Sequence, residues 1–188
     1  MATVKKILSP YAKEEMRALR CGDSVLLSGE IYTARDAAHA RITETIENGE
    51  SLPFCLENAI VYYVGPTPAK PGKIIGAAGP TTSSRMDIFT PLLIEAGLTG
   101  VIGKGARNLD VITAMQEHGV VYFGAIGGAG ALISRCIKKS EVIAYEDLGT
   151  EAIRKLTVED MPLTVIIDSE GNDLYVKGRE EYICKRKN

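Results

Sequence analysis

Three short stretches of the sequence carry side chains that could bind a small anion. They are residues 33–39 (TARDAAH), 79–87 (GPTTSSRMD) and 103–105 (GKG), and each begins where an apolar run ends. In α/β proteins the ends of such runs gather at one edge of the sheet, which is where ligands bind. The three stretches offer arginine, lysine and hydroxyl side chains. They therefore predict part of a pocket for a small polyanion.

Two cations in these stretches are candidate anion ligands. Arg35 falls in the first turn of an expected helix, where a cation opposes the helix dipole at a cost of about 0.3–1 kcal/mol. An anion held by the helix start and the guanidinium together would reverse this cost, although Arg35 could equally point into solvent. Lys104 lies between two glycines after an apolar run, where a lysine with a purely structural role gains little.

Asp36 and His39 lie close to Arg35 in the sequence and could support it without contacting the ligand. Thr33 and Asp36 are spaced as a capping box, in which each side chain covers a free amide of the other residue. That spacing gives Asp36 a structural role of its own. His39 lies one turn after Arg35 on the same helical face, where a single histidine serves packing more often than chemistry.

The stretch 79–87 contains four consecutive hydroxyl residues followed by an arginine. These hydroxyls could simply make turn and cap hydrogen bonds, but an arginine in the same run favours a binding role. Thr81 and Arg85 are four residues apart, so both can point toward the same edge if a helical turn starts between them. Gly79 allows close approach of a ligand to the backbone. Thr81 and Arg85 are therefore candidate site residues.

Two common nucleotide-binding motifs are absent. The phosphate loop G-x-x-x-x-G-K-[ST] is not matched, because Lys104 is followed by glycine and Leu98 stands where the first glycine should be. Residues 124–130 (GAIGGAG) are rich in glycine but do not fit G-x-G-x-x-G. This glycine run instead favours a helix that begins close to the sheet.

The composition indicates one globular domain, residues 1–188, with 45% hydrophobic residues. The balance of 22 basic and 24 acidic residues argues against a nucleic-acid surface, which needs clustered positive charge. No apolar run approaches the roughly 20 residues of a membrane span, and the N-terminus lacks the apolar core of a secretory signal. We therefore expect a cytoplasmic protein that binds neither nucleic acid nor membrane.

The cysteines predict no metal site within this chain. Cys21, Cys55, Cys136 and Cys184 lie far apart, and no C-x-x-C pair occurs. Zinc ribbons and most iron–sulfur segments need closely spaced thiols. We expect reduced, partly buried cysteines, as is usual in the cytosol.

Apolar runs alternate with helical patterns along most of the chain, which is typical of an α/β fold with a largely parallel central sheet. Extra strands come from the first sixty residues. The expected strands are 25–32, 59–64, 73–78, 100–103, 120–124, 142–145, 162–168 and 174–176. The expected helices are 11–20, 33–49, 88–97, 109–117, 129–137 and 151–156. Pro91 in the third implies either a kink or a restart with Thr90 as the cap residue.

With these residues laid out, the chain resembles the β subunit of two-subunit class I fumarases and L-tartrate dehydratases. The same unit is the C-terminal domain of single-chain class I fumarases. The motif G-P-T-T-x-x-R-M-D is the most specific part of the resemblance, and the matches cover nearly the whole chain in order. The matching stretches are 33–39, 79–87, 103–105, 149–153 (GTEAI) and 162–168 (PLTVIID).

The resemblance implies a swivelling β/β/α domain in which a smaller β layer accompanies the central sheet. It also implies a partner α subunit whose three cysteines bind a [4Fe–4S] cluster, with the fourth iron binding the substrate. The expected assembly is a hetero-oligomer, or a homodimer when the chain is isolated. The implied reaction is the reversible hydration of a small dicarboxylate, with fumarate and L-malate first and L-tartrate next.

The resemblance also implies roles for individual residues. Thr81 would sit at the reacting carbon and move its proton. An alcohol is a poor base unless a neighbour takes its proton, so Asp36, His39 or Lys104 would have to assist. Alternatively, Thr81 only positions the substrate and the partner supplies the base. The residues that would hold the substrate dicarboxylate are Arg35, Arg85 and Lys104.

Two other functions are compatible with the sequence. The chain could be a non-catalytic α/β module that binds an anion or a nucleotide through its glycine-rich loops. It could also be a purely structural interaction domain. The latter predicts that the candidate site residues scatter over the surface instead of converging.

Overall fold

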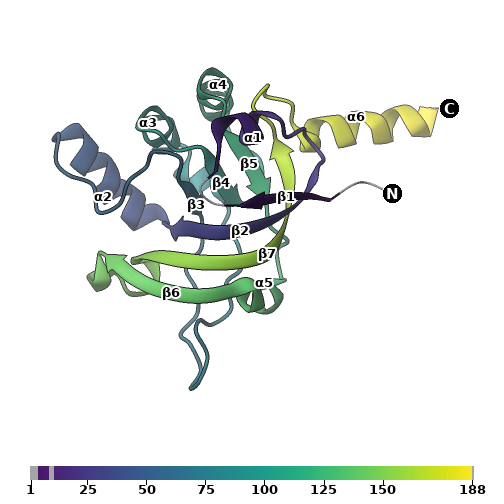
Figure 1. The fold of residues 1–188 in the computed structure, drawn as a ribbon. Helices are drawn as coiled ribbons and strands as arrows, with labels where there is room; N and C mark the ends of the chain where they lie inside the picture. Colours follow the sequence, from purple (N-terminus) through teal and green to yellow (C-terminus); the bar gives the residue numbers. More distant parts are fainter. Residues whose placement is uncertain (1–3, 9–10, 188) are drawn as a thin grey trace.

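The computed structural model describes residues 4–8 and 11–187 and is drawn in Figure 1. Among these residues, seven strands form one hydrogen-bonded sheet in the order β1-β2-β3-β4-β5-β7-β6, and a further pairing joins β2 to β7. Strands β2, β3, β4, β5 and β7 therefore close into a barrel. The strands are β1 (Lys5–Leu8), β2 (Ser24–Thr33), β3 (Ile60–Tyr62), β4 (Gly100–Gly103), β5 (Val121–Gly124), β6 (Ile137–Ala144) and β7 (Ile153–Ile167).

The strand directions confirm the α/β class, but the β strands are arranged differently from our expectation of two layers. Strands β1 to β5 pair in parallel, whereas β7 runs antiparallel to β2, β5 and β6. The additional smaller β layer that we expected is not a separate one. Strands β1, β2, β7 and β6 make the curved lower layer in Figure 1, and β2 and β7 join it to the parallel strands through hydrogen bonds.

Three of the helices cover one outer side of the barrel. Figure 1 shows α2, α3 and α4 on one side of the parallel strands and α6 projecting away from the body. The helices are α1 (Lys13–Arg17), α2 (Asp36–Glu47), α3 (Thr90–Glu95), α4 (Leu109–His118), α5 (Gly130–Cys136) and α6 (Leu174–Lys187). Two 3₁₀ turns, η1 (Ser83–Met86) and η2 (Glu146–Glu151), complete the described elements.

The parallel strands are buried on both faces, which explains why they read as continuous apolar runs. Successive side chains of a strand point to opposite faces. Ile60 and Tyr62 belong to the cluster inside the barrel, and the neighbouring Val61 and Tyr63 belong to the cluster beneath the helices. Both clusters consist of buried residues, so β3, β4 and β5 form a rigid base for the loops at their carboxyl ends.

Helix α2 begins later than expected, and the predicted capping box is wrong. Thr33 is the last residue of β2, where its hydroxyl accepts the Arg154 amide at 3.0 Å and donates to the Ala152 carbonyl at 3.4 Å. Arg35 is the N-cap residue and makes no capping hydrogen bond through its side chain. The Glu151 carboxylate instead accepts the Ala37 amide at 3.2 Å. A distant acidic residue thus stabilises the helix start.

The predicted strand 73–78 is also wrong, because these residues lie in a long irregular connection between β3 and η1. The two arms of this connection meet where Thr67 and Ala77 exchange hydrogen bonds of 3.0 and 2.8 Å. Prolines 66, 68 and 71 have no amide hydrogen for a strand ladder. The third helix restarts at Thr90 with Pro91 in its first turn, but its N-cap residue is Phe89 and not the expected Thr90.

The C-terminal third differs most from expectation. The predicted helix 151–156 is wrong, since β7 starts at Ile153, and β7 and β6 are both longer than predicted. The predicted strand 174–176 is wrong because Asp173 accepts the Tyr175 amide at 2.7 Å and starts α6. Within the described ranges, no helix is both long enough and apolar enough to cross a membrane.

Candidate active site

The predicted site residues follow the carboxyl ends of neighbouring parallel strands. Arg35 lies two residues beyond β2, and Lys104 directly follows β4. The Thr81 amide donates at 2.7 Å to the carbonyl of Tyr63, which directly follows β3. Because β2, β3 and β4 are adjacent and parallel, these residues lie along the same rim of the barrel.

Backbone contacts hold the second and third stretches together. Thr82 and Lys104 form an isolated parallel bridge, and the Ser83 amide donates to the Lys104 carbonyl at 2.8 Å. This close approach requires glycine at position 103, where a Cβ would lie 2.0 Å from the Ser83 hydroxyl oxygen. The stretch 79–87 therefore runs along the edge of β4 beside Lys104.

Asp36 joins the first stretch to the second through side chains. Its Oδ1 accepts a hydrogen bond from Arg85 Nε at 2.7 Å, and its Oδ2 lies 3.5 Å from the terminal nitrogen of Arg35. The same Arg35 nitrogen lies 3.3 Å from Glu151 Oε1. Two carboxylates and two guanidinium groups thus form one network at the start of α2.

The three predicted cations differ in how free they are. The Arg35 side chain is 20% exposed and already paired with two carboxylates. The Arg85 side chain is 52% exposed, and only its Nε is hydrogen-bonded to the part of the chain that the structure describes. Lys104 is exposed and makes no ion pair with any described residue. Arg85 and Lys104 can therefore bind an anion directly, whereas Arg35 is largely neutralised.

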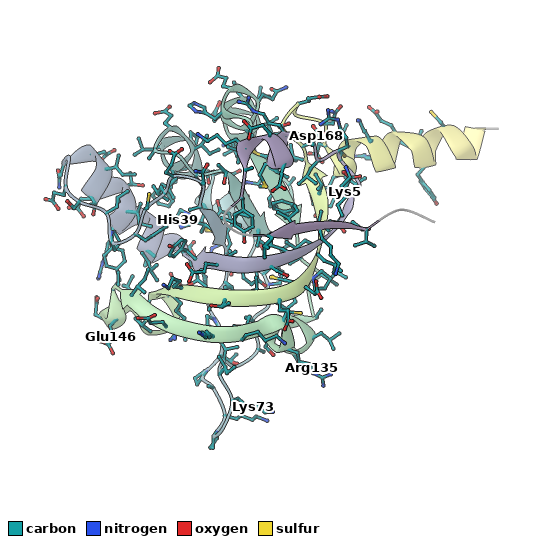
Figure 2. All side chains as sticks on the ribbon, viewed as in Figure 1. Lys5, His39, Lys73, Arg135, Glu146 and Asp168 are labelled. Carbon is teal, nitrogen blue, oxygen red and sulfur yellow. The ribbon has the colours of Figure 1, made fainter. Side chains whose placement is uncertain are left out.

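His39, labelled in Figure 2, is fully buried and is not placed to accept a proton at the rim. Its Nδ1 lies 2.9 Å from the Arg35 carbonyl oxygen, and its ring packs edge-on against Tyr63 at 5.1 Å. Burial lowers the pKa of His39 to about 4, so the ring is neutral near pH 7. Since a carbonyl can only accept, Nδ1 carries the hydrogen and donates to the N-cap residue of α2.

Thr81 is half-buried, and its hydroxyl makes no hydrogen bond to any residue within the described ranges. Neither Asp36 nor Lys104 bonds to it. The structure therefore brings Thr81 to the rim but gives it no base from this chain.

Sequence reasoning missed three charged residues of this region. Glu151 lay in a predicted helix, so its pairing with Arg35 could not be foreseen. Arg107 and Asp87 form a buried ion pair, with Nε 2.6 Å from Oδ1. The other Asp87 oxygen accepts the Asn108 amide at 2.8 Å. The only available signal was that Glu151 and Asp87 belong to stretches that carry the family resemblance.

Comparison with known proteins assigns the chain to a family. A family model described as "Fumarase C-terminus" matches residues 3–178. The chain belongs to the fumarase C-terminal family. The resemblance expected from the motifs is thereby confirmed at the level of the family.

Relatives of this fumarase C-terminal chain include whole enzymes and a separate subunit. It is 38% identical over 167 residues to "Fumarate hydratase 2" of Leishmania major, covering 88% of this chain and 29% of that protein. It is 40% identical over 151 residues to "Fumarate hydratase class I, aerobic" of Escherichia coli K12, covering 79% and 28%. It is 37% identical over 169 residues to "Putative L(+)-tartrate dehydratase subunit beta" of Methanocaldococcus jannaschii, covering 87% of each. The chain thus spans less than a third of the two fumarate hydratases but most of the β subunit.

The cysteines of the fumarase C-terminal chain do not fit an iron–sulfur cluster. All four are free, and no group of three or more histidine, cysteine or acidic side chains among the described residues could hold a metal ion. Burial raises the pKa of the Cys21 and Cys136 thiols, which disfavours the thiolate form that binds iron. Cys55 and Cys184 are exposed on separate parts of the chain.

Two hollows lie beside the long connection between β3 and η1. A hollow of about 850 Å³ lies between α5 and the connection that precedes η1, and another of about 410 Å³ lies between that connection and η2. Thr81, Arg85 and Lys104 line neither hollow. Arg85 and Lys104 are nevertheless exposed at the rim.

Proposed function

We propose that this chain is the β subunit of a two-subunit iron–sulfur hydro-lyase that adds water to, or removes it from, a small dicarboxylate. The observation that carries the proposal is the meeting of three separate stretches at one rim. There the outer nitrogens of Arg85 and Lys104 have no ion-pair partner among the described residues. The names of the relatives support this class of reaction. Fumarate and L-malate are the first candidate substrates, and L-tartrate is the next.

The three cations have distinct tasks in this proposal. The two terminal nitrogens of Arg85 can grip one carboxylate with parallel hydrogen bonds, which sets its orientation. Lys104 provides a point charge for the second carboxylate. Arg35 completes the substrate-binding set, but its pairing with Asp36 and Glu151 means that it contributes less positive charge to the substrate than Arg85 or Lys104.

These cations also lower the barrier of the proposed reaction. When a proton leaves a carbon next to a carboxylate, negative charge builds up on that carboxylate. Fixed positive groups stabilise this charge more in the transition state than in the ground state. Asp36 assists by holding Arg85 through Nε, which leaves the two terminal nitrogens directed elsewhere. His39 assists by fixing the carbonyl of Arg35 at the start of α2.

Thr81 is the residue that we assign to the reacting carbon. Because no described residue of this chain bonds to its hydroxyl, Thr81 can transfer a proton only if the substrate or the partner supplies a base. Without such a base, Thr81 positions the substrate and the partner removes the proton. Either role keeps the hydroxyl in contact with the substrate.

The proposal includes a partner α subunit that carries the [4Fe–4S] cluster, because the cysteines of this chain do not fit one. We expect this chain to be a swivelling β/β/α domain that closes against the α subunit. The α subunit would then cover the rim and exclude water from it. We expect a cytoplasmic hetero-oligomer, or a homodimer when the chain is isolated, and one domain over residues 1–188.

The test combines the chain with an α subunit under anaerobic conditions. Hydration of fumarate and dehydration of L-malate and L-tartrate are followed with and without iron and sulfide. We expect no activity from either subunit alone and iron-dependent activity from the pair. Activity of the isolated chain without iron would contradict the proposal, and calorimetry showing nucleotide binding but no dicarboxylate binding would favour a non-catalytic module.

A further inference from the structure

A buried tyrosine hydroxyl links the loop that carries Thr81 to the loop that carries Lys104. Tyr122 on β5 is fully buried, and its hydroxyl donates to the Gly105 carbonyl at 2.8 Å. The same oxygen lies 2.9 Å from the hydroxyl oxygen of Ser83, which is also fully buried. A phenol has a single hydrogen. Because that hydrogen is given to Gly105, Ser83 must be the donor to Tyr122.

This hydroxyl bridge lies next to the proposed site residues in both loops. Ser83 is two positions after Thr81, and Gly105 directly follows Lys104. A second connection comes from the backbone, where the Ser83 amide donates to the Lys104 carbonyl at 2.8 Å. We call the hydrogen bonds among Ser83, Tyr122 and Gly105 the tyrosine clasp. The tyrosine clasp fixes the distance between the loop that carries Thr81 and the loop that carries Lys104 through a side chain of β5.

The ring of Tyr122 is itself held in place by a buried cation. The Arg107 guanidinium carbon lies 5.3 Å from the Tyr122 ring centre and 5.4 Å from that of Tyr63. Arg107 is anchored by Asp87 at 2.6 Å and by the Thr90 hydroxyl at 2.8 Å. Asp87 ends the stretch that begins at Gly79. The stretch 79–87 therefore contributes to both ends of this arrangement: Ser83 bonds to the Tyr122 hydroxyl, and Asp87 anchors the arginine that packs on the Tyr122 ring.

We propose that Tyr122 and Ser83 are positioning residues that set the separation of Thr81 and Lys104 for catalysis. This inference rests on the proposed function, since it requires both residues to act on one substrate. Neither Tyr122 nor Ser83 touches the substrate. Loosening reacting groups by about 1 Å can slow an enzyme roughly 100-fold. The loss falls on kcat more than on KM, because the separation matters most in the transition state.

The experiment uses the complete two-subunit enzyme with Tyr122→Phe, Ser83→Ala and the double variant. Tyr11→Phe is the matched control, because its buried hydroxyl bonds to the carbonyls of Ser28 and Glu30 on β2, outside both loops. We expect Tyr122→Phe to lower kcat about tenfold or more with KM changed less than about threefold. The double variant should lose little more than Tyr122→Phe, because both changes break one connected network. Tyr11→Phe should keep its kcat.

A second measurement separates failure of the clasp from failure of the proposed function. Amide hydrogen exchange of the isolated chain is compared for the loops around Ser83 and Gly105. We expect faster exchange in both loops for Tyr122→Phe and unchanged exchange for Tyr11→Phe. An unmodified pair of subunits without hydro-lyase activity would contradict the proposed function. Unchanged exchange, or a Tyr122→Phe kcat within twofold of the parent, would overturn the clasp.

Discussion

Arg85 donates through Nε to Asp36 Oδ1 at 2.7 Å, and this single bond joins η1 to the start of α2 across 49 residues of sequence. This bond uses only the Nε–H group of the guanidinium and leaves the two terminal nitrogens for another anion. Asp36 is also 3.5 Å from Arg35. Asp36 therefore orients one arginine for binding while it partly neutralises the other.

Replacing Arg85 by alanine should remove the main carboxylate grip. We expect kcat/KM of the assembled enzyme to fall at least 100-fold, equivalent to about 2.7 kcal/mol of transition-state stabilisation. The unfolding free energy should change by less than about 1 kcal/mol, because the ion pair is largely exposed. Arg41→Ala is the control, since Arg41 forms an exposed ion pair with Asp147 outside the proposed site. Near-normal kinetics for Arg85→Ala would exclude Arg85 from the site.

Asp36→Asn tests the orienting role of this carboxylate. The amide keeps the shape of the side chain but loses the charge that holds Arg85. We expect KM for the dicarboxylate to rise about tenfold with a smaller effect on kcat, because a mobile arginine binds substrate less well before the reaction. Steady-state kinetics at several ionic strengths would measure this. A KM equal to that of the parent would show that Arg85 needs no support.

Breaking the buried Arg107–Asp87 pair should strongly destabilise the fold. Arg107→Met leaves the buried Asp87 carboxylate without its counterion, which typically costs about 3–5 kcal/mol. Urea unfolding of the isolated chain measures the loss. The double variant Arg107→Met, Asp87→Asn removes both charges and should regain part of it. If the double variant were as unstable as the single one, the loss would come from packing and not from the unpaired charge.

His39 should make stability depend on pH in a defined window. Its pKa is about 4 in the folded protein and 6.5 in the unfolded chain, so the unfolded state binds more protons between these values. Stability therefore rises with pH from about 4 to 6.5 and is complete above it, with a total contribution on the order of 3 kcal/mol.

The test compares urea unfolding at pH 4.5 and 7 for the parent, His39→Leu and His118→Gln. His118 is exposed on α4 and serves as the control. We expect His39→Leu to lose most of the pH slope and His118→Gln to keep it. An unchanged slope in His39→Leu would assign the pH dependence to carboxylates.

The parallel strands were predictable because burial on both faces leaves a local mark. Strands β3, β4 and β5 coincide with the apolar runs that we identified, and the loops after the strands were expected at one rim for the same reason. The first half of β7 was not predictable. From Ile153 to Val158 it mixes charged and apolar residues, since one side faces the barrel and the other is partly solvated.

The site was predictable as a set of stretches but not as a set of contacts. Lys104 stood out because it follows a buried strand. Thr81 and Arg85 stood out because they follow the apolar run 73–78, which is not a strand, and Thr81 reaches the rim through its hydrogen bond to Tyr63. Glu151 bonds to the Ala37 amide and pairs with Arg35, although it lies more than 110 residues away in sequence. Such long-range pairing leaves no local sequence pattern. The buried position of Arg107 was equally hidden, because a charged residue reads as exposed unless its partner is known.

The ring of strands is closed by β7, which pairs with β2 from Ser24↔Thr164 to Tyr32↔Lys155. During synthesis on the ribosome, β2 emerges more than a hundred residues before the strand that covers its edge. Until then this edge stays open to other chains, and contacts between such distant segments form slowly. Newly made chains should therefore depend on chaperones until their last strand is in place, and a stop codon before Met161 should yield aggregates.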